Sequence, residues 1–203
     1  MLFKESESSS AHVSKGNEAC AKGQWMQAKQ FFRLALKQDP SNTHALNGLG
    51  VICLQIDRPL RAIIYLERSH KLQKASKELT EFTHKDLIYS LNTAAVQLGN
   101  KKIWNRVIGL NRRALELQPL QITTLNNLSL AYLRTNNLEL ALYWSKVAIK
   151  LDNENPDVLN TRGTIIQEVG NVEEAKELYL KVLRLDPEHT SAVANIASLA
   201  QQD

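Results

Sequence analysis

The residues of this sequence best suited to recognition chemistry are amides that recur at a regular interval. Leu-Asn pairs occur with their asparagines at Asn47, Asn92, Asn126 and Asn160. The first interval between these asparagines is 45 residues, and the next two are 34 residues each. An asparagine side chain has one acceptor and two donors, so it can bind the N–H and C=O of a peptide unit together. These residues are therefore candidates for binding a polypeptide backbone.

Covalent and metal chemistry have little support in the sequence. Cys20 and Cys53 lie far apart, and the five histidines are scattered without the Cys/His spacing of a metal site. The sequence contains no nucleophile elbow, glycine-rich phosphate loop or HExxH motif. We interpret Cys53 as a small buried residue, and a reactive thiol at Cys20 is an alternative for the other cysteine. We therefore expect no enzyme activity, no cofactor and no metal.

Composition indicates an ordinary globular chain of 203 residues, with 43% hydrophobic residues and 25 basic against 21 acidic side chains. A net charge of +4 is smaller than the concentrated excess of a dedicated nucleic-acid binder. The first residues lack the apolar core of a secretory signal, and no apolar stretch is long enough to span a bilayer. Two cysteines without a pairing pattern fit a reducing compartment, so we expect a cytoplasmic location and no membrane span.

The Leu-Asn pairs define the phase of a repeat. With Leu46 as the fourth residue of its unit, the repeats span 9–42, 43–76, 88–121, 122–155 and 156–189, with an insertion at 77–87. We expect 9–203 to be one domain that ends in a capping helix at 190–203, after a disordered tail at 1–8. Position 8 of the units holds small residues, Gly16, Gly50, Ala95, Ser129 and Gly163. Antiparallel helices approach closely only where side chains are small, and these residues would allow such an approach.

The period, the small residues and a proline at position 32 of three units, Pro40, Pro119 and Pro187, make the sequence resemble the tetratricopeptide repeat family. The resemblance covers about nine-tenths of the chain. It implies an all-α fold, a right-handed α-solenoid of five helix-turn-helix hairpins plus a C-terminal capping helix. Each hairpin leaves an apolar face that the next unit covers.

The insertion at 77–87 has a length of about three helical turns. We expect it to extend the second helix of repeat two, the first helix of repeat three, or both. It is either a neutral length variation or a protruding element that contacts a partner through Phe82.

The resemblance also implies that the first helices line a concave groove. The predicted peptide-binding residues are Asn17, Asn47, Tyr89, Asn92, Asn126, Leu130, Asn160 and Arg134. Asn47, Asn92, Asn126 and Asn160 would form a ladder, of which Asn92 and Asn126 are expected to face solvent in the free protein. Alternatively, these asparagines merely fill a polar surface. Co-chaperones of the family hold an acidic C-terminus with a two-carboxylate clamp. Asn17 matches that clamp, but Val13, Tyr89 and Thr93 replace its basic residues, so we expect no clamp here.

Basic residues gather in repeat three. They are Lys101, Lys102, Arg106, Arg112 and Arg113. The resemblance implies that the second helix, which carries the arginines, faces outward. The cluster is either a solvated convex face or a patch that binds an acidic partner, RNA or a lipid headgroup.

Together these features predict a protein–protein interaction adaptor or scaffold that binds an extended peptide in the concave groove. We expect a protein or peptide partner, with no small-molecule substrate and no nucleic acid. The alternative is a substrate-recognition or assembly module of a larger enzyme or of a secretion- or pilus-type complex.

Overall fold

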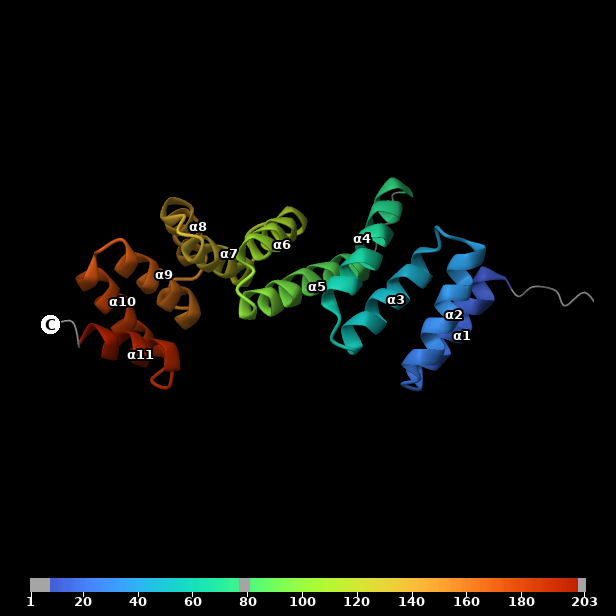
Figure 1. Cartoon of the computed structure of the whole chain (residues 1–203), viewed down its shortest axis with the longest axis horizontal. Coiled ribbons are helices and arrows are strands. Elements are labelled where there is room, and N and C mark those ends of the chain that lie inside the picture. Colours follow the sequence, from blue (N-terminus) through green and yellow to red (C-terminus); the bar gives the residue numbers. More distant parts are fainter. Residues whose placement is uncertain (1–7, 77–80, 201–203) are drawn as a thin grey trace, which may run out of the picture. The chain divides into compact units, whose positions relative to one another are not determined.

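The computed structural model describes residues 8–76 and 81–200. Within these ranges the chain forms eleven α-helices and no strand, as the sequence predicts (Figure 1). The helices are α1 (Ser9–Ala21), α2 (Trp25–Gln38), α3 (Thr43–Gln55), α4 (Pro59–Ser76), α5 (Glu81–Asn100), α6 (Trp104–Leu117), α7 (Ile122–Arg134), α8 (Leu138–Leu151), α9 (Pro156–Glu168), α10 (Val172–Leu185) and α11 (Thr190–Leu199). Of the predicted disordered tail, only Ser8 is described. The predicted capping helix is described over 190–200, and the rest of both segments lies outside the described residues.

The chain divides into two compact units, one up to Ala94 and one from Ala95 onward. The boundary falls within α5. In the first unit α1 packs on α2 and α3 packs on α4, and in the second unit α7 packs on α8 and α9 packs on α10. Each described unit is therefore built from helical hairpins, and the all-α solenoid is confirmed. That the whole chain acts as one domain stays a prediction.

Polar residues fix the helix starts. Asn42 and Asn155 precede α3 and α9, and their Oδ1 atoms accept hydrogen bonds from the backbone N–H groups of Ala45 (2.9 Å) and Val158 (3.2 Å). These bonds satisfy N–H groups that have no partner within the helix. As a result α3 and α9 begin at Thr43 and Pro156, the first residues of their predicted units.

The turn inside every hairpin depends on one backbone conformation. Position 15 of all five units has a positive φ, at Gly23 (70°), Asp57 (53°), Lys102 (57°), Asn136 (59°) and Gly170 (95°). A left-handed residue ends the first helix and turns the chain toward the second. Because Lys102 follows the same rule as the other four, the register of repeat three is that of the other units after the insertion.

The insertion coincides with two long helices. α4 has 18 residues and α5 has 20, whereas the other second helices have 14 and the other first helices of the repeats have 13. Lys74 replaces the proline that ends the second helix in three other units, so α4 continues through this position. Both helices next to the insertion are thus extended, while its residues 77–80 lie outside the described range.

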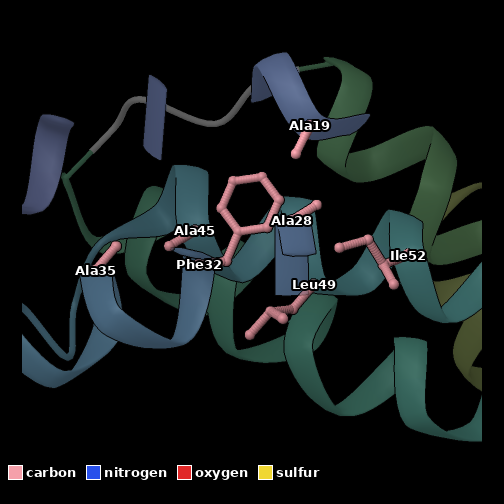
Figure 2. Packing of buried hydrophobic residues seen from close by; sticks show 7 residues of the cluster. All are labelled: Ala19, Ala28, Phe32, Ala35, Ala45, Leu49 and Ile52. Carbon is pink, nitrogen blue, oxygen red and sulfur yellow. The ribbon is translucent and has the colours of Figure 1, made fainter. Parts of the chain in front are cut away.

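The residues at positions 8 and 24 of a unit pack against each other and have complementary sizes, so that a glycine at position 8 faces a large residue at position 24. We call this relation the size exchange. Phe32, at position 24 of repeat one, is fully buried among Ala19, Ala28, Ala45 and their neighbours (Figure 2). A Cβ atom on Gly16 would lie 2.6 Å from its ring, closer than packed atoms approach.

The same exchange recurs along the chain. Leu66 fills the space above Gly50, and Tyr179 fills the space above Gly163. Where position 8 is Ala95 or Ser129, the buried residues at position 24 are the smaller Asn111 and Ser145. In repeat three this exchange places an amide in the core, and neither Nδ2 nor Oδ1 of Asn111 has a hydrogen-bond partner among the described residues.

Candidate functional site

Three of the predicted groove residues line one pocket in the second unit. Asn126 and Leu130 come from α7 and Asn160 from α9, and the pocket has a volume of about 320 Å³. Asn127 and Thr161 add further polar groups to its wall. We call it the amide pocket. It is formed by the first helices, α7 and α9, together with the start of α11, and its role in peptide binding stays a prediction.

The asparagines in the amide pocket differ in their hydrogen bonding. Asn160 Oδ1 accepts a bond of 3.0 Å from Asn195 Nδ2 of α11. Oδ1 of Asn126 is buried and has no partner among the described residues. A buried acceptor without a partner is unfavourable by about 1–3 kcal/mol. A ligand N–H that reaches Asn126 would relieve this penalty.

His189 and Asp157 also line the amide pocket. Nδ1 of His189 accepts a bond of 3.2 Å from the N–H of Ala192 and so caps α11. Since Nδ1 is the acceptor, the neutral ring carries its proton on Nε2, which lies 3.3 Å from Oδ1 of Asp157. Sequence reasoning missed His189 as a site residue. The available signal was its position, because the last residue of a unit caps the next first helix at Asn42 and Asn155 as well.

A second pocket of the same unit adjoins the amide pocket. It has a volume of about 200 Å³ and shares Asn127 and Leu130 with the amide pocket. Val96 of α5 and Trp104 of α6 supply much of its apolar wall. We call it the apolar pocket. Amide groups and an apolar hollow therefore lie side by side on the second unit.

The first unit has a pocket of its own, about 380 Å³ in volume and lined by Asn17, Asn47, Val51 and Phe82 among others. We call it the Phe82 pocket. Asn47 Nδ2 donates a bond of 2.7 Å to Thr83 Oγ1 of α5, and Asn47 Oδ1 is buried without a partner within the described part of the chain. The insertion residue Phe82 is 57% exposed and faces this pocket.

Burial of the asparagines corrects one expectation. Asn92 and Asn126, which were expected to face solvent, are half-buried, as are Asn47 and Asn160, so these side chains are only partly open to solvent. Asn47 and Asn160 each bond to the next first helix in the chain, so they also connect neighbouring repeats. Substitutions at these positions will therefore affect stability as well as binding.

The remaining predicted groove residues line none of these three pockets. Tyr89 is 61% exposed on α5, Asn92 is half-buried on the same helix, and Arg134 is exposed at the end of α7. Their role in binding stays a prediction.

The two cysteines are poor nucleophiles in this setting. Burial raises the pKa of the Cys20 thiol, and burial likewise raises the pKa of Cys53 against the opposing influence of nearby cations. The reactive thiolate is disfavoured at both positions. Cys20 lies on the wall of the Phe82 pocket and contributes packing surface there.

The predicted basic cluster of repeat three is mostly open to solvent. Lys101, Lys102, Arg106 and Arg112 are exposed. Arg113 is half-buried, and its Nη1 lies 3.0 Å from Oε2 of Glu116. Four of the five cations are thus accessible, and a binding role for the cluster remains a proposal.

Neither a metal centre nor a membrane helix emerges from the part of the chain that the structure describes. Within 8–76 and 81–200, no three His, Cys, Asp or Glu side chains come together as metal ligands. No helix in these ranges is both long and apolar enough to cross a membrane.

Comparison with known proteins finds helical-repeat chains. Residues 13–76 and 156–189 each match a family described as tetratricopeptide repeat. Tetratricopeptide repeat protein 6 from Homo sapiens is 26% identical over 160 residues, which are 75% of this chain and 27% of that protein. The chain thus spans about a quarter of the length of this curated relative.

Solved structures show the same fold at low sequence identity. YrrB, described as a TPR protein with an unusual peptide-binding site, has 21% identity and a TM-score of 0.66 over 90% of this chain and 89% of its own. MamA has 20% identity and a TM-score of 0.63 over 89% of this chain and 92% of its own. The first TPR of Spaghetti (RPAP3), bound to the HSP90 peptide SRMEEVD, has 20% identity and a TM-score of 0.51 over 57% of this chain and 91% of its own.

Proposed function

Because the chain belongs to the tetratricopeptide repeat family, whose members are protein-interaction scaffolds, we propose that its first helices bind an extended peptide segment of a partner protein. The amide pocket is the observation that carries this proposal. It combines half-buried asparagines with an acceptor on Asn126 that has no partner among the described residues. A rotation of the Asn126 amide toward the pocket would let this acceptor bind a backbone N–H of a peptide.

The neighbouring apolar pocket supports an extended conformation of the ligand. Successive side chains of an extended segment point to opposite sides. With its backbone at Asn126, the segment can place an apolar side chain near Leu130 and Trp104. The amides then provide affinity for any sequence, and the apolar pocket provides selectivity.

The Phe82 pocket of the first unit is more apolar than the amide pocket. Val51, Phe32 and Phe82 make it largely apolar, while Asn17 and Asn47 supply the amides. We propose that it accepts a large apolar side chain. Under this proposal Phe82 contacts the ligand, so the insertion is a binding element and not a neutral length variation.

Similar structures favour a peptide ligand, and the residues of this chain argue against the carboxylate clamp. YrrB is described as having a peptide-binding site, and the RPAP3 domain was solved with a peptide. Val13, Tyr89 and Thr93 stand where the clamp requires basic residues. We therefore propose recognition of an internal extended segment, with no catalytic role for the chain.

A peptide library displayed on phage and selected on the purified protein tests the proposal. Enriched peptides are synthesised, and their dissociation constants are measured for the wild type, Asn126→Ala and Asn105→Ala. The loss of one hydrogen bond at Asn126 is expected to weaken binding by about threefold to tenfold. Asn105 is an exposed asparagine of α6, so its substitution is the matched control and should leave affinity unchanged. Equal affinity of all three proteins would place the binding surface elsewhere.

The alternative function is that of an assembly or substrate-recognition module in a larger complex. The specific observation in its favour is that the matching human relative is much longer than this chain. Affinity purification from the native host with mass spectrometry separates the two functions. An enzyme recovered in equal molar amount with the chain would support the alternative, and the same experiment on fractionated cells would test the expected cytoplasmic location.

A further inference from the structure

Positive charge is concentrated on the second helices of the first unit. The sequence of α2 has three basic residues, Lys29, Arg33 and Lys37, and no acidic one. α4 has four basic residues and a single acid, Glu67. By contrast α10 of the last repeat has three basic and three acidic residues. This excess of basic residues on α2 and α4 lies outside repeat three and is separate from the predicted basic cluster of that repeat.

Three of these cations line one crevice between α2 and α4. Lys29 and Arg33 lie four residues apart and therefore on the same face of α2, while Arg61 and Tyr65 have the same relation on α4. We call this the basic crevice. Arg68 Nη2 donates a bond of 2.7 Å to the carbonyl oxygen of Pro40, just after the end of α2. This contact joins α4 to the turn that follows α2.

The floor of the basic crevice is apolar. It consists of Leu49, Ile52, Cys53 and Ile56, and the volume above it is about 40 Å³. About 10–15 Å³ is enough for one water molecule, so the crevice admits the tip of one side chain. None of the described residues that line it is acidic. Lys29, Arg61 and Arg33 all act on the Cys53 thiol by lowering its pKa, against the larger effect of burial.

We propose that the basic crevice binds an acidic segment of a partner protein in which one apolar side chain lies between carboxylates. Lys29, Arg33 and Arg61 attract the carboxylates, and the floor buries the apolar side chain. A nucleic acid backbone would satisfy the cations but has no apolar group for the floor. Among the described residues that line the crevice, Tyr65 has the one aromatic ring, and a single ring is no platform for stacked bases. This surface is separate from the first-helix pockets and does not depend on their function.

Fluorescence anisotropy with designed peptides tests the proposal on the full chain. The probes are fluorescein-labelled EDDLDDE, the same peptide with serine in place of leucine, and a single-stranded oligouridylate. The protein variants are Lys29→Glu with Arg33→Glu, and the control Lys146→Glu with Lys150→Glu. Lys146 occupies the same repeat position in α8 as Arg33 in α2. Both double variants change the net charge equally, so only the location of the charges differs.

The wild type is expected to bind the leucine peptide, and the crevice variant to bind it about tenfold or more weakly, since each reversal replaces an attraction by a repulsion. Affinity should also fall between about 0.1 and 1 M salt, as the Debye length shortens from about 10 to about 3 Å. If the double reversal lowers the melting temperature, Arg33→Gln against Lys146→Gln provides the comparison, with an expected loss of about threefold. Equal losses in crevice and control variants, equal affinity for the serine peptide, or tighter crevice-dependent binding of oligouridylate would each overturn the proposal.

Discussion

The size exchange between positions 8 and 24 makes a quantitative prediction at Gly163 and Tyr179. In Gly163→Ala the new Cβ would lie 2.6 Å from Cε1 of Tyr179, so the ring must shift. Tyr179 is fully buried, and its hydroxyl donates a bond of 2.9 Å to Oε1 of Gln167, which opposes the shift. Overpacking of this kind destabilises by about 1–3 kcal/mol, while alanine in a helix gains about 1 kcal/mol over glycine. Gly163→Ala should therefore lower the free energy of unfolding by about 0–2 kcal/mol.

The effect of Gly163→Ala on the free energy of unfolding should change sign when the ring of Tyr179 is absent. Tyr179→Asn reproduces the pairing that repeat three makes with Ala95 and Asn111, although alone it should cost about 3–5 kcal/mol as a large buried aromatic is lost. In that background Gly163→Ala has no ring to displace, and it should stabilise by about 1 kcal/mol. The coupling energy between the two sites is then about 1–3 kcal/mol.

Urea denaturation followed by far-UV circular dichroism measures all four proteins of this cycle. Repeat arrays can unfold in parts. The comparison therefore holds only if the slope of the free energy of unfolding against urea concentration is the same in the four proteins. If Gly163→Ala has the same effect with tyrosine and with asparagine at 179, the size exchange does not determine the packing, and the reasoning fails.

Three further predictions concern stability. Asn111→Ala removes two buried amide atoms that have no partner in the described structure and keeps a small residue opposite Ala95, so it should raise the free energy of unfolding by about 0–2 kcal/mol, the relief of the unpaired amide less the loss of packing, measured by urea denaturation; a destabilised variant would indicate that the amide is satisfied. Lys102→Gly should stabilise by about 0.5–1 kcal/mol because φ is 57° there, whereas Lys101→Gly, with the same loss of charge and no positive φ, should not. Deletion of 190–203 removes Leu199 from its cluster with Ile166 and Tyr179, so the truncated protein should melt at a lower temperature or self-associate in analytical ultracentrifugation; an equally stable monomer would show that the segment is no cap.

The sequence predicted the hairpins well because their determinants are local. The Leu-Asn pairs set the phase, and with it the starts of α3 and α9 and the common turn at position 15. These features depend on capping residues, small residues and turn residues within a single unit. The register of repeat three after the insertion followed from the same pairs.

Contacts between repeats were less accessible to sequence analysis. The half-burial of Asn47 depends on where the extended α5 places Thr83, and that location depends on the insertion. The bond from His189 to Asp157 and the convergence of Lys29, Arg33 and Arg61 likewise join residues about 30 positions apart. The regular spacing of the asparagines located part of the amide pocket, but it could not show which of their atoms are satisfied.

The most direct test of peptide binding by the first helices is nuclear magnetic resonance of the side-chain amides. A peptide selected on the wild-type protein is titrated into the ¹⁵N-labelled chain, with assigned Nδ2 resonances of Asn126, Asn127 and Asn105. The proposed function predicts saturable shifts at Asn126 and Asn127, which line the amide pocket, and unchanged resonances at Asn105. Shifts confined to Asn105 and the second helices, with Asn126 and Asn127 unmoved at saturation, would contradict it.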